Sequence, residues 1–350
     1  MTKLKKKVVV IGAGHNALTC ASYLAKSGFE VEVHEARSEV GGMACTREFT
    51  EGYKVPGVAH LLHMLNPGIQ KWLGLNKNGL EFSANRLKTI SLNPNGNALV
   101  IDGDHLEGDG ITDQHRAEFK SFKKTTNSLA RFFRSTYQIS PPRIRTDNKK
   151  DLLGLMQTGW NLRTMGNEGM TDMLRFIAIN VYDLLEEYFD DDFIKGSLAI
   201  DAVLGNHLGP RTNNSVITYL HTLTGEIDGV QGAYAIPKGG MSSYTNALKN
   251  SAEKLGVRIV LDSQVEQIIV DDNGKASGVK FTKGNEVSAD VVVSGIDPKS
   301  TFICLVGARH LEAGFVHKIN NVRMRGNASK LHLALSGLPS FNGVDEKDIG

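Results

Sequence analysis

A short apolar run followed at once by two closely spaced glycines constrains the fold of this chain more than any other feature. Val8 to Ile11 is short enough to be a strand buried on both faces of a parallel sheet. Gly12 permits a tight turn after that strand, and Gly14 has no side chain to keep a phosphate away from the backbone. Ala17 replaces the third glycine of the usual pattern and is still small enough for a helix to lie close on the strand. The pattern therefore predicts a strand, a turn and a helix, with a phosphate site at the turn.

The residues that follow complete a dinucleotide-binding unit. Alanines at helical spacing predict a helix from about Asn16 to Ser27, and polar–apolar alternation predicts a second strand from Glu30 to His34. Glu35 then stands at the end of this strand, about 20 residues after the first glycine, where a carboxylate can accept both hydroxyls of an adenosine ribose. The helix N-terminus offers free N–H groups and a positive dipole end to the phosphates. The turn residues expected at the dinucleotide are Gly12, Ala13, Gly14, His15 and Asn16.

A second glycine pair lies just past the acid, within the stretch EARSEVGGM. Composition alone would favour an ordinary glycine turn here. Directly after a GxGxxA unit, however, the stretch resembles the FAD-binding signature of the amine oxidase and phytoene desaturase superfamily. The resemblance implies that the acid holds the FAD ribose and that the arginine and the glycine pair lie along the pyrophosphate. NAD enzymes usually lack the second pair, so FAD is expected and an NAD-only dehydrogenase is the weaker alternative. The residues of this stretch expected at the cofactor are Glu35, Ala36, Arg37, Gly41, Gly42 and Met43.

The same fold is expected to return in the second half of the chain. A helix is predicted from Ser242 to Leu255, followed by short strands at 257–261, 265–270, up to 281, and 289–294. This order resembles the second part of the superfamily's FAD domain, and the resemblance implies that the backbone of Val265 touches the adenine. The stretches VVVSGIDPKSTF and RMRGNASKLHLALSGLP carry the resemblance further. Family members continue to a second glycine-rich segment, so the C-terminal part of the family fold is expected to be missing here.

These features predict an α/β protein of two interleaved domains, because 350 residues exceed the size at which a single core usually stops growing. A Rossmann-like FAD-binding domain is expected from residues 1–65 and 235–305. A mixed α+β substrate domain, mostly a helical insert, is expected from residues 66–234 and 306–350. Within it, a hairpin is predicted around Asn93 to Asn97 and a mostly buried helical region up to Gly225.

Two groups of polar residues invite other interpretations. His60 and His63 could share a helical face and bind a metal, but no third ligand has the right spacing, and hydrogen bonding near a flavin or substrate is the alternative. The acidic run from Asp190 to Asp192 is more typical of a helix cap than of a metal site. No metal site is expected, and no catalytic residue can be assigned by spacing.

Composition excludes several other classes of protein. With 40 Lys and Arg against 38 Asp and Glu, the net charge is +2, so a nucleic-acid partner that needs a broad basic face is not expected. No apolar run has the length of a membrane span, and no signal peptide is expected before the first strand. The 3 cysteines contain no CxxC, which excludes a thioredoxin-reductase-like dithiol and fits a cytoplasmic location.

The resemblance implies a dehydrogenase or desaturase that passes hydride from a substrate carbon to the flavin, with an unknown electron acceptor. The apolar insert fits a hydrophobic small-molecule substrate. The basic amphipathic stretch from Thr112 to Thr136 could lie on an anionic membrane surface, although a core-facing apolar stripe is the commoner arrangement. The alternative from another class is a non-catalytic binding protein, because Rab GDP-dissociation inhibitors resemble the same superfamily. Glu35 and the second glycine pair argue against it, since a chain without a nucleotide needs neither.

Overall fold

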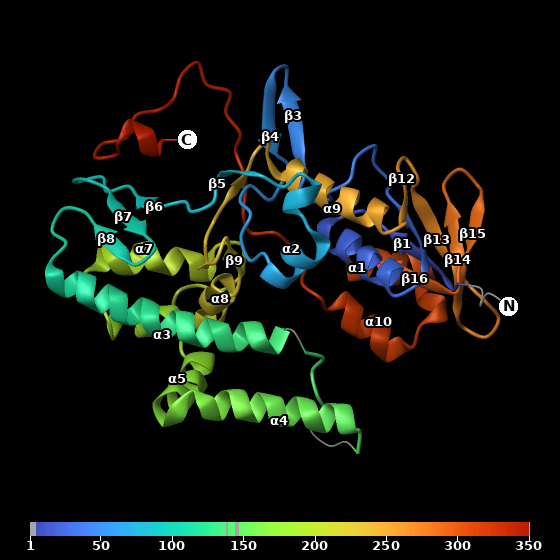
Figure 1. Cartoon of the computed structure of the whole chain (residues 1–350), viewed down its shortest axis with the longest axis horizontal. Helices are drawn as coiled ribbons and strands as arrows, with labels where there is room; N and C mark the ends of the chain where they lie inside the picture. The colour runs from blue at the N-terminus through green and yellow to red at the C-terminus, as the bar shows by residue number, and fades with distance from the viewer. Residues whose placement is uncertain (1–4, 138, 144–146, 350) are drawn as a thin grey trace. The chain divides into compact units, whose positions relative to one another are not determined.

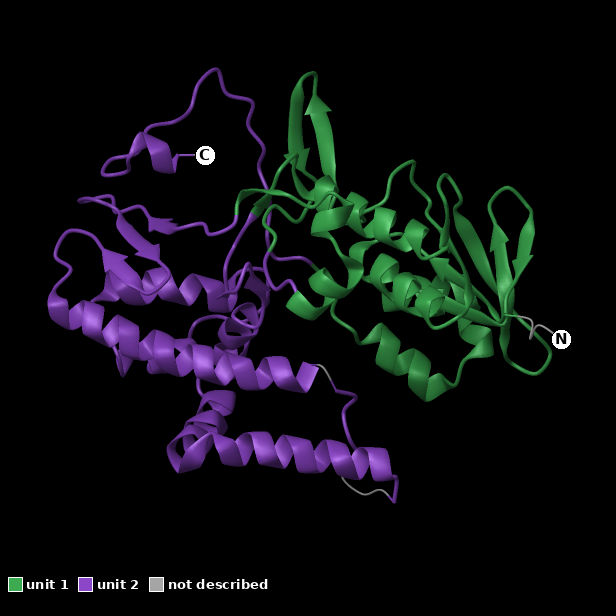
Figure 2. Cartoon of the chain, viewed as in Figure 1, with its two compact units in different colours: residues 1–62, 67–84, 236–325 green, residues 63–66, 85–235, 326–350 purple. Residues whose placement is uncertain are grey.

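The computed structural model describes residues 5–137, 139–143 and 147–349. The chain forms two compact units, each assembled from separate stretches (Figure 2). Unit 1 comprises residues 1–62, 67–84 and 236–325, and unit 2 comprises residues 63–66, 85–235 and 326–350. The assignment of one domain to FAD and the other to the substrate stays a prediction.

Unit 1 is built on a parallel sheet with the strand order β12-β2-β1-β16. Its strands are β1 (Lys7–Ile11), β2 (Glu30–His34), β12 (Arg258–Val260) and β16 (Val291–Ser294). Val8 pairs with Val31 on one side and with Val291 on the other, so β1 is central and its middle residues have no exposed surface. Helix α1 (His15–Lys26) connects β1 to β2. The parallel α/β architecture predicted from the glycine pattern is confirmed.

A second helix and a meander complete the core of unit 1. Helix α9 (Met241–Lys254) lies beside α1 (Figure 1). The meander consists of β13 (Val265–Val270), β14 (Ala276–Phe281) and β15 (Glu286–Ser288). Its buried side chains pack against Val9 and Ile11 of the central strand. The remaining elements are β3 (Thr46–Thr50), β4 (Tyr53–Pro56), α2 (Pro67–Leu73), β5 (Phe82–Ala84), β11 (Ile236–Pro237), a π-helix (Ser300–Gly307), α10 (Ala313–Asn320) and the 3-10 helices Asn76–Asn78 and Ala308–His310.

Unit 2 packs helices against a small antiparallel sheet. The sheet contains β6 (Thr89–Ser91), β7 (Leu99–Asp102) and β8 (His105–Glu107). The helices are α3 (Asp113–Tyr137), α4 (Lys149–Thr164), α5 (Gly166–Ala178), α6 (Val181–Glu186), α7 (Asp192–Val203) and α8 (Ser215–Thr222), with the short strands β9 (Glu226–Ile227) and β10 (Val230–Gln231) and the 3-10 helix Glu346–Asp348. Phe119 and Phe122 of α3 are completely buried, so the apolar stripe of that helix faces the core. This is the commoner of the two arrangements considered for it.

The structure adds elements that the sequence did not predict. No helix or strand is assigned from the sequence to residues 49–80, yet the hairpin of β3 and β4 overlaps this stretch and helix α2 lies within it. Strands β8 and β15 each extend a predicted hairpin by one short strand. Such three-residue strands are too short to show alternation, so only their neighbours reveal them.

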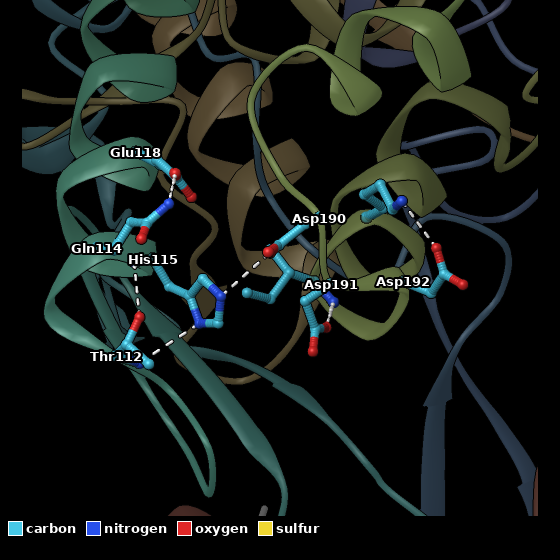
Figure 3. A network of polar contacts seen from close by, with 9 residues as sticks. Thr112, Gln114, His115, Glu118, Asp190, Asp191 and Asp192 are labelled. Carbon is cyan, nitrogen blue, oxygen red and sulfur yellow. Dashed lines mark hydrogen bonds and ion pairs between the residues drawn. The ribbon is translucent and has the colours of Figure 1, made fainter.

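The acidic run from Asp190 to Asp192 organises the start of α7 (Figure 3). The Asp191 carboxylate accepts from the Ile194 N–H at 2.8 Å and caps the helix. Asp192 pairs with Lys195 at 2.8 Å, and Asp190 lies 3.3 Å from a ring nitrogen of His115. Within the described residues no group of three His, Cys, Asp or Glu side chains is arranged to hold a metal ion. The run therefore acts as a cap with ion-pair partners.

Candidate functional site

The glycine turn after β1 is fixed by backbone contacts on both sides. Gly12 has φ +86°, and its N–H donates to the His34 carbonyl at 2.8 Å. The Ile11 carbonyl accepts from the Gly295 N–H at 2.8 Å. A Cβ at position 12 would lie 3.2 Å from Cγ2 of Ile296. The left-handed backbone and this close neighbour together account for a glycine at the turn.

Glu35 closes the site from the end of β2. Its carboxylate is buried, and one oxygen accepts from the Ala13 N–H at 2.7 Å. The other oxygen accepts from the Arg37 N–H at 3.0 Å. A carboxylate has about four acceptor positions, so these bonds leave two for ligand hydroxyls. Glu35 therefore orders the glycine turn and keeps acceptor capacity next to it.

The second glycine pair touches the first at the backbone. The Gly41 N–H donates to the Ala13 carbonyl at 2.9 Å, and Gly14 and Gly41 form a parallel bridge. A Cβ at Gly42 would lie 3.3 Å from Cα of Gly14. Gly41 has φ +122°, and its Cβ would lie 2.9 Å from Oγ1 of Thr245 on α9. The fold itself thus needs small residues at both positions of the pair.

Gly14 differs from the other glycines of the motif. Its φ of −68° and ψ of 163° suit any residue, and a Cβ there would meet no atom within 4 Å. No side chain caps the N-terminus of α1, and no acidic residue lies in its first turn. An open position in front of uncapped N–H groups, beside the buried carboxylate of Glu35, matches the phosphate and ribose groups of a dinucleotide. The residues present fit the cofactor.

The other predicted site residues lie around this cradle. His15 begins α1, and its ring lies 6.4 Å from that of Tyr244, while burial lowers the pKa of the imidazole. Asn16, Ala36, Arg37 and Met43 are exposed. The role of the Arg37 side chain at the pyrophosphate stays a prediction.

Val265 reaches the same edge of the sheet through the segment before β13. The Ser263 N–H donates to the Glu35 carbonyl at 2.8 Å, and the Asp262 N–H donates to the Arg37 carbonyl at 3.0 Å. Val265 itself is buried at the start of β13. The backbone of this segment therefore runs alongside Glu35. Its contact with adenine stays a prediction.

Three residues at the site carry no sequence signal of their own. Thr245 approaches the second glycine pair from α9, and Ile296 flanks the first turn from the end of β16. His34 bonds through Nδ1 to Oγ of Ser263 at 2.9 Å and packs against the Phe281 ring at 4.6 Å. Thr245 and Ile296 come from positions distant in the chain, and His34, next to Glu35, gains its partners Ser263 and Phe281 only when the sheet closes.

The environment of His34 disfavours its charged form. Burial lowers the pKa of the imidazole, and the nearby cations of Arg258 and Lys7 lower it further. The Glu32 carboxylate at 3.6 Å opposes this shift without reversing it. The neutral form of His34 is therefore favoured, and its side chain supports the end of β2 next to Glu35.

His60 and His63 do not share a helical face, because neither lies on a helix. His63 belongs to unit 2, where its ring lies 5.2 Å from that of Tyr234, whereas His60 belongs to unit 1. A metal pair on one helical face would need both histidines on a helix. That interpretation is therefore wrong, because the segment does not form a helix.

Unit 2 contains a cavity of about 80 Å³ between its sheet and its helices. Polar and apolar side chains line it, among them Phe119, Lys123, Asp201, Tyr219, Leu223 and Tyr234. The Tyr234 hydroxyl bonds to the Asp201 carboxylate. Burial raises the pKa of Asp201 and lowers that of Lys123. The opposite charges nearby therefore do not fully offset the cost of burying either charged group. The cavity is large enough to hold several water molecules.

The sheet, the glycine cradle and the buried acid define a dinucleotide-binding protein of the FAD type. The chain belongs to the flavin-containing amine oxidoreductase family, whose sequence model matches residues 18–339. FAD is the cofactor of this flavoprotein, and the resemblance inferred from the EARSEVGGM stretch is confirmed.

Individual relatives and a solved structure agree with this family. The chain is 29% identical over 350 residues to pyridine nucleotide-disulfide oxidoreductase domain-containing protein 2 of Rattus norvegicus, covering 95% of this chain and 60% of that protein. It is 24% identical over 370 residues to phytoene desaturase of Fusarium fujikuroi, covering 100% of this chain and 61% of that protein. An oxidoreductase from Methanosarcina mazei has the same fold, with a TM-score of 0.57 at 16% identity, covering 90% of this chain and 65% of that one. The chain thus spans about 60% of the length of the curated relatives it matches.

Proposed function

We propose that the protein is an FAD-dependent oxidoreductase of the dehydrogenase or desaturase type, acting on an apolar small molecule. Bound FAD supplies the acceptor for hydride in such a reaction. The contribution of the protein is to bind the dinucleotide, to fix its orientation and to keep water from its buried parts. The electron acceptor that completes a turnover is a separate molecule of unassigned chemistry.

The open cradle at Gly14 is the observation that carries the proposal. The N-terminus of α1 offers unpaired N–H donors and a positive dipole end to the two phosphates. Glu35, held by the N–H groups of Ala13 and Arg37, presents its remaining acceptor positions to the ribose hydroxyls. A protein that bound only another protein or a lipid would have no physical use for an open position at Gly14.

An apolar substrate is supported by the relative named phytoene desaturase and by the composition of unit 2. The cavity of unit 2 carries Leu87, Ile101 and Leu198 on its walls besides its polar groups. We assign substrate recognition to this unit, with Asp201 and Lys123 among the titratable groups that line the cavity. A cytoplasmic location stays a prediction.

An absorption spectrum of the purified chain, recorded with and without added FAD, tests the proposal. Flavin bands that copurify or appear on addition, and that weaken in Gly14→Ala, are expected. Glu39→Gln is the matched control, because this acid is exposed in the same loop and should leave the bands unchanged. A protein that stays colourless and does not quench FAD fluorescence would refute the flavoenzyme and favour the non-catalytic binding protein.

A further inference from the structure

Helix α4 (Lys149–Thr164) exposes more apolar surface than a solvated helix normally does. None of its residues is buried. Leu152 is 54% exposed, Leu153 and Met156 are each 64% exposed, and Trp160 is 68% exposed. Large apolar side chains that are scattered singly over a surface need no explanation, but four on one helix mark an interaction site.

These four residues form one continuous stripe. Leu152, Met156 and Trp160 are spaced at i, i+4 and i+8, and Leu153 adjoins them, so all four point to the same side of the helix. The opposite side faces unit 2, where Leu162 packs against the core and Asn161 bonds to Ser135 of α3 at 3.3 Å. The stripe therefore cannot rotate inward without breaking these contacts.

Cations stand at both ends of the stripe. Lys149 lies one turn before Leu153, and Arg163 follows Trp160 by three residues, so both project from the apolar side. Among the residues that the structure describes, neither forms an ion pair with an acid. The two cations are separated by about 20 Å along the helix, and the stripe lies between them. Long basic side chains can rise to a polar layer while their stems cover apolar surface.

The adjoining helix α5 (Gly166–Ala178) repeats the arrangement. Leu174 is 67% exposed, and Met170 and Ile177 are 40% and 37% exposed at i−4 and i+3 from it. Met173 and Phe176, on the neighbouring side of α5, lie in the core of unit 2. Both helices of this pair thus contact the core and leave part of their apolar surface uncovered. In the described part of the chain, no helix is long and apolar enough to cross a bilayer.

We propose that the uncovered side of α4 lies in the surface of an anionic lipid bilayer. Leu153, Met156 and Trp160 insert among the acyl chains, and Lys149 and Arg163 reach the headgroup phosphates. An in-plane amphipathic helix with a basic rim and an aromatic anchor has this composition. A second copy of the chain fits less well, because antiparallel pairing of α4 with itself would set Lys149 of each copy against Arg163 of the other. The proposal concerns this surface alone and does not depend on flavin binding.

Trp160 provides a direct reporter, because the chain has only one other tryptophan. Trp72 stacks on Tyr23 at 3.9 Å in unit 1 and is replaced by phenylalanine for the experiment. The Trp72→Phe protein is mixed with vesicles of phosphatidylcholine, with or without phosphatidylglycerol, some carrying brominated acyl chains. A blue shift of Trp160 emission and quenching by the brominated chains are expected, both stronger with phosphatidylglycerol.

Variants separate the apolar and the electrostatic contributions. Leu153→Ser with Met156→Ser should lower vesicle affinity about tenfold or more, since both side chains insert. Lys149→Gln and Arg163→Gln should each lower it about fivefold on anionic vesicles only. Leu204→Ser is the control, because Leu204 is 65% exposed on unit 2 outside this surface and should have no effect. Thermal unfolding of each variant shows that the fold is kept.

Two outcomes would overturn the proposal. The first is the absence of any emission shift or vesicle binding at either lipid composition. The second is a concentration-dependent dimer, seen by analytical ultracentrifugation, that Leu153→Ser abolishes while vesicles have no effect. That result would assign the surface to a second copy of the chain.

Discussion

Replacing Gly14 by alanine separates the requirements of the cofactor from those of the fold. The backbone at Gly14 suits any residue, and the added methyl meets no protein atom. Alanine is a poorer N-cap than glycine by up to about 1 kcal/mol. It also restricts the unfolded chain, which favours the folded state by about 0.4–1 kcal/mol. The two effects nearly cancel, so the free energy of unfolding without FAD should change by no more than about 0.5 kcal/mol.

The effect on FAD binding should be much larger. The methyl would occupy the space through which the phosphates approach the N-terminus of α1. Forcing a methyl group into filled space costs about 1–3 kcal/mol, which corresponds to about a 5- to 150-fold loss of FAD affinity. Quenching of FAD fluorescence measures the affinity, and urea unfolding of the cofactor-free protein measures the stability.

Gly196→Ala is the matched control for this substitution. Gly196 lies within α7 of unit 2, and a Cβ there also meets no atom within 4 Å. It should gain about 0.5–1 kcal/mol of stability and leave FAD affinity unchanged. Unaltered FAD affinity in Gly14→Ala would show that the open position is not the phosphate site. Loss of the cofactor-free fold in Gly14→Ala would show that the glycine serves the fold instead.

Three further predictions follow from the same contacts. Glu35→Gln leaves either the Ala13 or the Arg37 N–H without its acceptor. The cofactor-free protein should therefore lose about 1–3 kcal/mol of stability, and FAD should bind more weakly. The exposed Glu39→Gln variant should be unchanged in both assays. Gly41→Ala should lower the free energy of unfolding in urea by about 1–3 kcal/mol, because the added Cβ would press on Thr245 in a left-handed backbone. Adding Thr245→Ala should restore part of the loss. Full stability of the single variant would contradict the close contact between Gly41 and Thr245. The pKa of His34 is held below its ordinary value mainly by burial, so the stability that neutral His34 contributes is present above about pH 6.5 and is lost as the pH falls through the folded-state pKa. Urea unfolding from about pH 8 to pH 5 should therefore show a smaller acid loss for His34→Asn than for the unaltered protein, and identical slopes would exclude His34 as a source.

The sequence predicts the centre of unit 1 because the relevant signals are local. Strand β1, the turn at Gly12, helix α1 and strand β2 follow one another without a break, and each has its own period or punctuation. The sequence does not predict which glycine serves the cofactor and which serves the fold. Gly41 is expected at the pyrophosphate, and only the folded unit shows that Thr245, from a distant helix, also requires a glycine there. Its contact with the cofactor stays a prediction.

Alternation of apolar and polar residues does not by itself predict a strand, because a strand also needs a neighbouring strand to pair with. Leu331, Leu333 and Leu335 alternate with polar or small residues, which is the pattern of a half-buried strand. In the described part of the chain no strand pairs with this segment, and the three leucines are 79%, 64% and 51% exposed. A strand forms only when a neighbour accepts and donates its backbone hydrogen bonds, and no periodicity within the segment can supply that neighbour.

Helices α3 and α4 show the same limit for amphipathic helices. Both carry an apolar stripe with basic residues, and by periodicity alone α3 is the better candidate for a membrane surface, because its charged side is longer. The structure reverses the order: Phe119 and Phe122 of α3 have no exposed surface, whereas Leu153 and Trp160 of α4 are more than half exposed. Periodicity reports that a helix has two sides, but whether the core covers the apolar side depends on elements elsewhere in the chain. An apolar stripe that the core leaves uncovered is therefore information that only the folded unit provides, and in this protein it moves the candidate lipid contact from α3 to α4.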